Sequence, residues 1–141
     1  MNRTLHLDHV QFDIFSDLDF RDDNGTLIAH APDTDLATLR CSVTSVYRKG
    51  EEVRQVAERE IPQLADESGG QHELIGEKFL FRTHKASSDD SRDTVHYWHL
   101  GLGGHIAVVT VFVDHRLQDD PRARHVMDCA DLVIQTFQRT P

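Results

Sequence analysis

The chain has few of the residues and segments that assign a protein to a specialised class. It contains two cysteines, Cys41 and Cys129, with no CxxC spacing and no further cysteine to form a disulfide or zinc framework. No window approaches the roughly 18 consecutive apolar residues of a membrane span. Residues 1–13 hold no apolar stretch of secretory length. We therefore expect a cytoplasmic protein with reduced thiols, whose mature chain starts close to Met1.

Positive charge is also scarce. The 24 Asp and Glu residues outnumber the 15 Lys and Arg residues, so the net charge is −9 with histidine neutral. A negative field repels phosphate backbones and anionic lipids, which disfavours nucleic-acid and membrane binding and favours a basic protein partner. The same excess charge could serve solubility alone. At 141 residues, without repeats, low-complexity tracts or linkers, we expect one domain over residues 1–141 that folds without a disulfide or metal.

Seven segments have the residue patterns of β-strands, either an alternation of apolar and polar residues or a short apolar run. They are residues 10–15, a short strand through Leu27, Ala29 and Ala31, then 37–47, 72–76, 78–84, 94–101 and 105–113. The stretch 37–47 alternates most cleanly, which indicates an antiparallel sheet with one polar face. Asn24-Gly25 and the GLGG at 101–104 predict tight turns, and the polar residues 86–93 an exposed hairpin tip. Residues 105–113 are apolar on both faces, which predicts a central strand covered on both sides.

Two segments have helical periodicity. The first opens at Gly50 and places Val53, Val56, Ala57, Ile61 and Leu64 on one side. Pro62 lies inside this pattern and predicts a kink or break near Glu60. The second has Asp120 as its cap, Pro121 at its first position and an apolar stripe from Ala123 to Phe137. The predicted order is β-β-β-α-β-β-β-β-α, an α+β domain with a single antiparallel sheet of about seven strands and two packing helices.

This order resembles the Mog/PsbP-like superfamily. The strings that carry the resemblance are RDDNGTLIAHAP, LRCSVTSVYRKGEEVRQVAEREI and YWHLGLGGHIAVVTVFVD with the closing helix, and together they cover roughly residues 10 to 138. Members of the superfamily include a Ran-binding nuclear-import factor, a photosystem subunit and bacterial chaperones for secreted effectors. The resemblance implies a binding platform, usually without catalysis. It supplies no site residues, because no family motif is matched.

Histidine is the one residue present in unusual number, with ten in the chain. The densest group is His84, His96, His99 and His105, on predicted neighbouring strands. In HYWH, His96 and Trp98 share one face while Tyr97 and His99 share the other, so His96 and His99 cannot chelate one metal together. A metal site would need one of them with His84 or His105. The alternatives are exposed histidines on a polar face or a pH-sensitive surface.

The other candidate chemistry has weaker support. Cys41 lies on an apolar strand face, and Cys129 at the edge of the last helix's apolar stripe, which favours buried thiols over nucleophiles. GLGG joins two predicted strands and so lacks the strand-to-helix context of a phosphate loop. No G-x-S-x-G motif is present. The aspartates from Asp17 to Asp23 fail the EF-hand pattern, because position one would be Phe20, and predict a solvated acidic loop. We predict no catalytic residue, metal or cofactor.

The aromatic residues Tyr97, Trp98, Phe79 and Phe81 predict a cluster across adjacent strands. Two helices cannot cover both faces of such a sheet completely, so an aromatic side chain on an open face would form a docking surface. Tyr97, Trp98, His96 and His99 are the candidate residues for it. The sequence therefore favours a non-catalytic protein-binding module, such as an adaptor, secretion chaperone or immunity-type protein. A ligand- or metal-binding enzyme using the histidine-rich strands at 84–105 is the alternative, and a homodimer joined through a sheet is compatible with the first.

Overall fold

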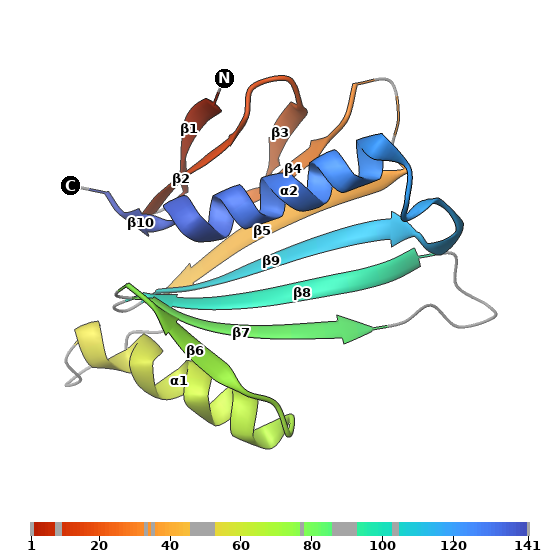
Figure 1. Ribbon diagram of the computed structural model, residues 1–141. Helices are drawn as coiled ribbons and strands as arrows, with labels where there is room; N and C mark the ends of the chain where they lie inside the picture. The colour runs from red at the N-terminus through yellow and green to blue at the C-terminus, as the bar shows by residue number, and fades with distance from the viewer. Residues whose placement is uncertain are drawn as a thin grey trace.

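The computed structural model describes residues 2–7, 10–32, 34, 36–45, 53–76, 78–85, 93–102 and 105–140. Along the chain, five strands precede the first helix, four strands lie between the two helices, and one short strand follows the second helix (Figure 1). In chain order the elements are β1 (Asn2–Leu7), β2 (Val10–Phe15), β3 (Asp19–Asp23), β4 (Thr26–His30), β5 (Ala37–Ser45), α1 (Val53–Glu67), β6 (His72–Ile75), β7 (Lys78–Lys85), β8 (Asp93–Leu102), β9 (His105–Asp114), the 3-10 turn η1 (His115–Leu117), α2 (Pro121–Thr136) and β10 (Gln138–Arg139).

A seven-stranded antiparallel sheet is the centre of the fold, which confirms the predicted α+β class. Its strand order is β3-β4-β5-β9-β8-β7-β6, so β9 is the middle strand, as predicted for residues 105–113. The predicted covering of β9 on both sides is only partly correct. Ala107, Val109, Val111 and Val113 are buried on one face, while the residues between them are only half-buried.

Three strands form a second, smaller sheet that the sequence analysis did not predict. Its order is β1-β2-β10, and β2, expected in the main sheet, is its central strand. The expected element order therefore reappears with β1, β3 and β10 added. β1 and β10 escaped prediction because they are mostly exposed, polar in sequence and, for β10, two residues long. Such strands are defined by pairing with β2 rather than by a hydrophobic pattern.

The stretch expected to be an acidic loop is instead an edge strand. Residues Asp19–Asp23 form β3 and pair with β4 through a two-residue connection, Asn24-Gly25. Both connecting residues have positive φ, 52° and 89°, as the predicted tight turn requires. The acidic side chains kept β3 from resembling a strand. On an edge strand, exposed charges are a normal protection against pairing with another chain.

The helix α2 covers one face of the main sheet, across β5 and β9 (Figure 1). Its predicted start is confirmed: the Asp120 side chain accepts a hydrogen bond from the Arg122 backbone N–H at 2.9 Å, and Pro121 occupies the first helical position. Its apolar stripe, from Ala123 to Ile134, is buried against β2, β5 and β9 in the main core. The small sheet adds Phe12 and Ile14 to that core.

The helix α1 packs against β7 and β8 at the β6 end of the main sheet. Ile61 and Ala65 are fully buried and form a second, small core with Phe81. Of the kink or break predicted near Glu60, the break is wrong, because α1 is continuous from Val53 to Glu67 with Pro62 inside it. Burial of Ile61 and Ala65, one turn apart, anchors the helix on both sides of the proline and offsets the lost backbone hydrogen bond. The expected helix opening at 50–52, the hairpin tip at 86–92 and the turn at 103–104 lie outside the described residues.

Neither described helix combines the length and apolar character needed to cross a membrane.

Candidate functional site

The pairing of β8 with β9 decides which side each candidate residue occupies. Tyr97 lies opposite Thr110, and Trp98 lies opposite Val109. Because side chains alternate along a strand, Trp98 and His96 belong to the face that α2 covers, with Val109 and Val111. Tyr97 and His99 belong to the opposite face. The four predicted surface residues are therefore divided between two sides of the sheet, as the sequence pattern indicated.

Trp98 is part of the main core. Its side chain is only 6% exposed and belongs to the same buried cluster as Leu100 and Val109. The His96 ring lies 6.1 Å from the Trp98 ring, centroid to centroid, on the same face. Trp98 thus offers little surface to a partner, whereas its neighbour Tyr97 is half-buried on the opposite side.

The face opposite α2 holds a row of half-buried apolar and hydroxyl side chains on its two middle strands. We call these residues the open face: Val95, Tyr97, Val108, Thr110 and Phe112. Among the described residues, α1 contacts this side of the sheet at one end, where it buries Phe81 and packs on Phe79 and Ile106. The open face continues from that end towards β4 and β3.

Charged residues border the open face on the β3 side. Arg40 on β5 lies opposite Thr110, and its guanidinium carbon is 5.2 Å from the centre of the Phe112 ring. This is the geometry of a cation–π contact. The register also places Asp19, Arg21 and Asp23 of β3 on this side, and all three are exposed. The surface therefore has an aromatic and hydroxyl centre with a charged rim, the usual anatomy of a protein interface.

His99 lies where the open face meets α1. Its ring is 6.0 Å from the Phe81 ring, and its Nδ1 atom is buried without a hydrogen-bond partner among the described residues. Burial lowers the pKa of His99, because the surroundings disfavour the charged imidazolium. Burial therefore favours the neutral form of His99 at the edge of the open face.

Among the described side chains, the histidines predicted as possible metal ligands do not form a metal-binding group. His96 and His99 are on opposite faces of β8, and His105 is at the start of β9. Within the described part of the chain, no group of three or more His, Cys, Asp or Glu side chains is arranged to hold a metal ion. The His84 side chain lies outside the described set, although its backbone pairs with His96.

Both cysteines are buried and separate. Burial raises the pKa of the Cys41 thiol to about 12 and that of Cys129 to about 11. A thiol with such a pKa is almost entirely protonated near neutral pH and is a poor nucleophile. The expected role of both residues as small apolar side chains agrees with these positions in the core.

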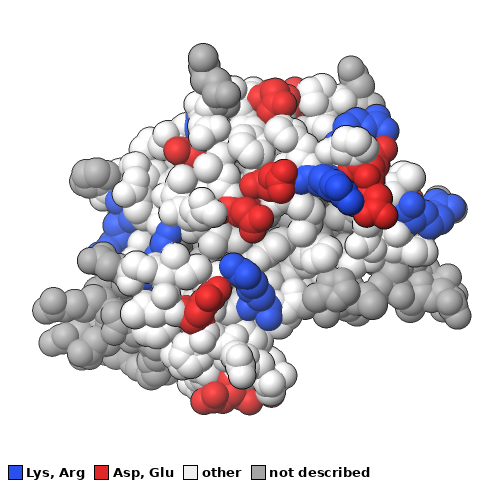
Figure 2. All heavy atoms as spheres, in the orientation of Figure 1, with Lys and Arg blue, Asp and Glu red and all other residues white. Residues whose placement is uncertain are grey.

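The outer side of α2 differs from the open face. Figure 2 shows acidic and basic side chains interspersed over α2 and the surface around it. Asp128 and Asp131 are exposed there, and Arg124 pairs with Asp119 at 3.1 Å. This side resembles an ordinary solvated helix surface.

Sequence reasoning missed one buried charge on the α2 side of the sheet. Lys78, at the start of β7, is 8% exposed, and its ammonium donates hydrogen bonds to the backbone carbonyls of Ile134 and Gln135 in α2, at 2.7 and 3.0 Å. Burial lowers the pKa of Lys78. The only sequence signal was a lysine flanking the apolar run FLF, which is equally typical of an exposed strand end.

No protein-family model matches the chain, and no curated protein matches it. Several solved structures have a similar fold, among them the following two. A crystal structure from Bacteroides thetaiotaomicron VPI-5482 aligns with a TM-score of 0.66 at 18% identity, over 94% of this chain and 46% of its own length. The chain thus spans about half of that protein. The solution structure of cyanobacterial PsbP (CyanoP) from Synechocystis sp. PCC 6803 aligns with a TM-score of 0.59 at 10% identity, over 98% of this chain and 92% of its own. These similarities concern the fold alone, and on them this chain has a PsbP-like fold.

Proposed function

We propose that this domain is a non-catalytic protein-binding module of the Mog/PsbP-like superfamily, and that its partner docks on the open face. The observation that carries the proposal is the position of Tyr97. Its side chain is half-buried in the middle of a sheet face that the described side chains of α1 contact at one end. Tyrosine contributes large contact area at a small entropic cost, which is why it is enriched at binding hot spots.

The chemistry around Tyr97 supports a protein partner rather than a small substrate. The described residues of the open face carry apolar and hydroxyl groups, with no acid–base pair or activated nucleophile among them. Val108 and Phe112 supply apolar contact, and Thr110 can exchange hydrogen bonds with a partner backbone. A partly desolvated centre of this kind, surrounded by charge, excludes water from the contact.

The partner that fits best is a basic protein in the cytoplasm. The net charge of −9 steers cationic molecules towards the domain. The rim of the open face carries both signs of charge, with Asp19 and Asp23 on either side of Arg21, so the preference for a basic partner rests on the net charge. The buried, separate thiols of Cys41 and Cys129 suit a reducing compartment.

Site-specific photocrosslinking in the source organism tests this assignment. A benzophenone amino acid would replace Tyr97 in one variant and Asp131, on the outer side of α2, in a control variant. We expect the variant at 97 to crosslink one reproducible, basic protein that mass spectrometry identifies, and the variant at 131 to give none of it. The identified partner, produced separately, should bind the wild-type domain with one-to-one stoichiometry.

A second measurement checks that the crosslink reports binding on the open face. Thr110→Lys adds a positive charge at the centre of that face, and Gln135→Lys adds the same charge at an exposed position of α2. We expect Thr110→Lys to weaken binding of the basic partner at least tenfold, or about 1.4 kcal/mol, and Gln135→Lys to leave it unchanged. Equal crosslinking from positions 97 and 131 would contradict the proposal. So would a product containing two copies of this chain, which would indicate a homodimer.

A further inference from the structure

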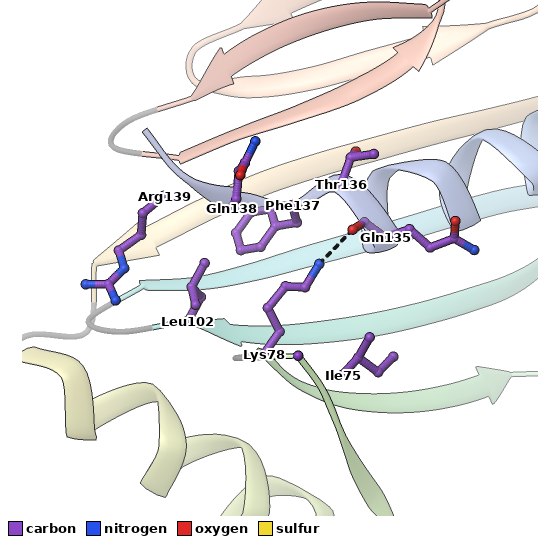
Figure 3. Close-up of a pocket in the computed structure, with 9 residues that line it drawn as sticks. Ile75, Lys78, Leu102, Gln135, Thr136, Phe137, Gln138 and Arg139 are labelled. Atoms are coloured by element: carbon purple, nitrogen blue, oxygen red, sulfur yellow. Dashed lines mark hydrogen bonds between the residues drawn. The ribbon is translucent and has the colours of Figure 1, made fainter. Parts of the chain in front are cut away.

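Cavities border α2 at both of its ends, and none of their lining residues belongs to the open face. The cavity at Lys78, at the C-terminal end, has a volume of about 450 Å³ (Figure 3). The Lys78 ammonium there donates hydrogen bonds to the carbonyls of Ile134 and Gln135, as Figure 3 shows for Gln135. These contacts cap the helix, so they account for the burial of this lysine. The cavity at the N-terminal end contains a different polar group.

This second cavity lies between the first turn of α2, the end of β4 and the turn after β2. Its volume is about 370 Å³, within the range of roughly 300–1,000 Å³ in which proteins bind small molecules. Half of its lining residues are apolar, and the others are an acid, an arginine and a histidine: Ala31, Pro32, Pro121, Asp17, Arg122 and His125.

The two charged side chains of this lining already have partners. The Arg122 guanidinium donates to both carboxylate oxygens of Asp120 at 3.2 Å, and Asp17 accepts from the His125 ring. Neither charge therefore needs a counter-ion from a ligand. The described lining favours an uncharged molecule that packs against the apolar wall.

His125 is held in one orientation by two contacts. Its ring stacks on the ring of Phe15, with centroids 4.6 Å apart and planes 9° from parallel. Its Nε2 atom lies 2.9 and 3.0 Å from the two carboxylate oxygens of Asp17. The hydrogen bond from His125 lowers the pKa of Asp17, so the carboxylate stays ionised and can only accept. The hydrogen of the neutral imidazole is therefore on Nε2.

The other ring nitrogen of His125, Nδ1, is then a hydrogen-bond acceptor. It makes no hydrogen bond with the described residues, and it is not one of their buried polar atoms, so it is accessible. Phe15 covers one face of the ring and does not line the cavity. The cavity therefore meets the other face of the ring and its free edge.

We propose that this cavity binds a small, uncharged phenol. The phenolic O–H donates a hydrogen bond to Nδ1 of His125, and the aromatic ring lies against Ala31, Pro32 and Pro121. A flat ring packs closely on the pyrrolidine rings of the two prolines and beside the stacked rings of Phe15 and His125. An aliphatic alcohol offers the same donor without that flat apolar surface.

Titration followed by ¹⁵N-NMR tests this site at about pH 8.5, where imidazole groups are neutral. The probe is p-cresol, and the control is anisole, its isomer without an O–H donor. We expect saturable shifts of the backbone amides of Ala31 and Arg122 and of the Nδ1 resonance of His125 with p-cresol. Anisole should bind about three- to tenfold more weakly, because it cannot make the hydrogen bond.

A histidine variant tests the role of Nδ1. His125→Phe keeps an aromatic ring that can stack on Phe15 but has no nitrogen, so it should bind p-cresol only as weakly as anisole. His6→Phe makes the same change at an exposed position of β1 outside this cavity and should bind p-cresol as the wild-type protein does.

Three results would overturn the proposal. One is a set of shifts that does not saturate by about 10 mM p-cresol. Another is equal affinity of the wild-type protein for p-cresol and anisole, which would mean that the O–H is not recognised. The third is a His125→Phe protein that binds p-cresol as tightly as the wild type. The comparison of the two ligands needs only the wild-type protein, so it decides the proposal even if His125→Phe does not fold.

Discussion

Replacing Trp98 by alanine tests whether this residue belongs to the core or to a docking surface. The side chain is 6% exposed and lies in the main core. An aromatic side chain buries about 200 Å² on folding, and about 25 cal/mol per Å² gives about 5 kcal/mol. Aromatic-to-alanine changes in cores cost about 3–5 kcal/mol. We therefore expect Trp98→Ala to lower the free energy of unfolding by about 3–5 kcal/mol.

Urea denaturation provides the measurement, and Tyr97→Ala is the matched variant. Trp98 is the only tryptophan, so unfolding of the variant must be followed by far-UV circular dichroism. Tyr97 is its direct neighbour on the opposite face and is only half-buried, so its truncation should cost less than about 2 kcal/mol. The wild-type protein should also show the blue-shifted fluorescence of a buried indole.

The reasoning would be refuted if Trp98→Ala cost less than about 1.5 kcal/mol, or less than Tyr97→Ala. Either result would mean that the indole contributes little to the core. Trp98 would then again be a candidate residue of the binding surface.

Three further predictions concern single positions. Lys78→Met should cost about 1–3 kcal/mol, because the carbonyl of Ile134 loses its charged donor, and hydrogen exchange should show faster opening of the last turn of α2. Gly70→Ala should cost about 1–3 kcal/mol in urea denaturation, because the added Cβ would lie 2.8 Å from Cζ of the buried Phe81 ring; an unchanged midpoint would show that the ring can move away. Burial lowers the pKa of His99 in the folded state, so below its unfolded pKa of about 6.5 the unfolded chain binds the proton more readily, and stability falls as the pH drops. His99→Gln should make the free energy of unfolding less dependent on pH between about pH 7 and pH 5, and an unchanged slope would assign that dependence to other histidines.

The local sequence pattern was sufficient to predict the strands and helices that place a row of residues in the core. The strand at Ala37–Ser45, the strand at His105–Asp114 and the start of α2 at Asp120 all followed from periodicity and capping, and all are present. These signals are local, because a half-buried strand or an amphipathic helix must place apolar residues at a fixed spacing. The turn at Asn24-Gly25 is of the same kind, since it depends on two residues that tolerate positive φ.

Pairing and packing between distant segments could not be predicted from these local sequence patterns. The strand at Asp19–Asp23 is acidic and exposed, and it forms because the β4 edge offers it hydrogen bonds. Pro62 predicted a kink or a break, yet α1 continues through it, and Ile61 and Ala65 pack with Phe81 in the second core. In both cases tertiary interactions outweighed a local propensity.

The sequence by itself determined the α+β class, the central strand, the net negative charge and the division of the HYWH residues between two faces, because each depends on composition or on the two-residue period of a strand. Only the tertiary structure decided which of those faces the described helices leave mostly uncovered. α2 lies over Trp98's side and the small sheet completes that core, whereas α1 reaches only one end of Tyr97's side. The cavity at Lys78 is likewise a product of the tertiary fold, since residues 56 positions apart in the chain meet there.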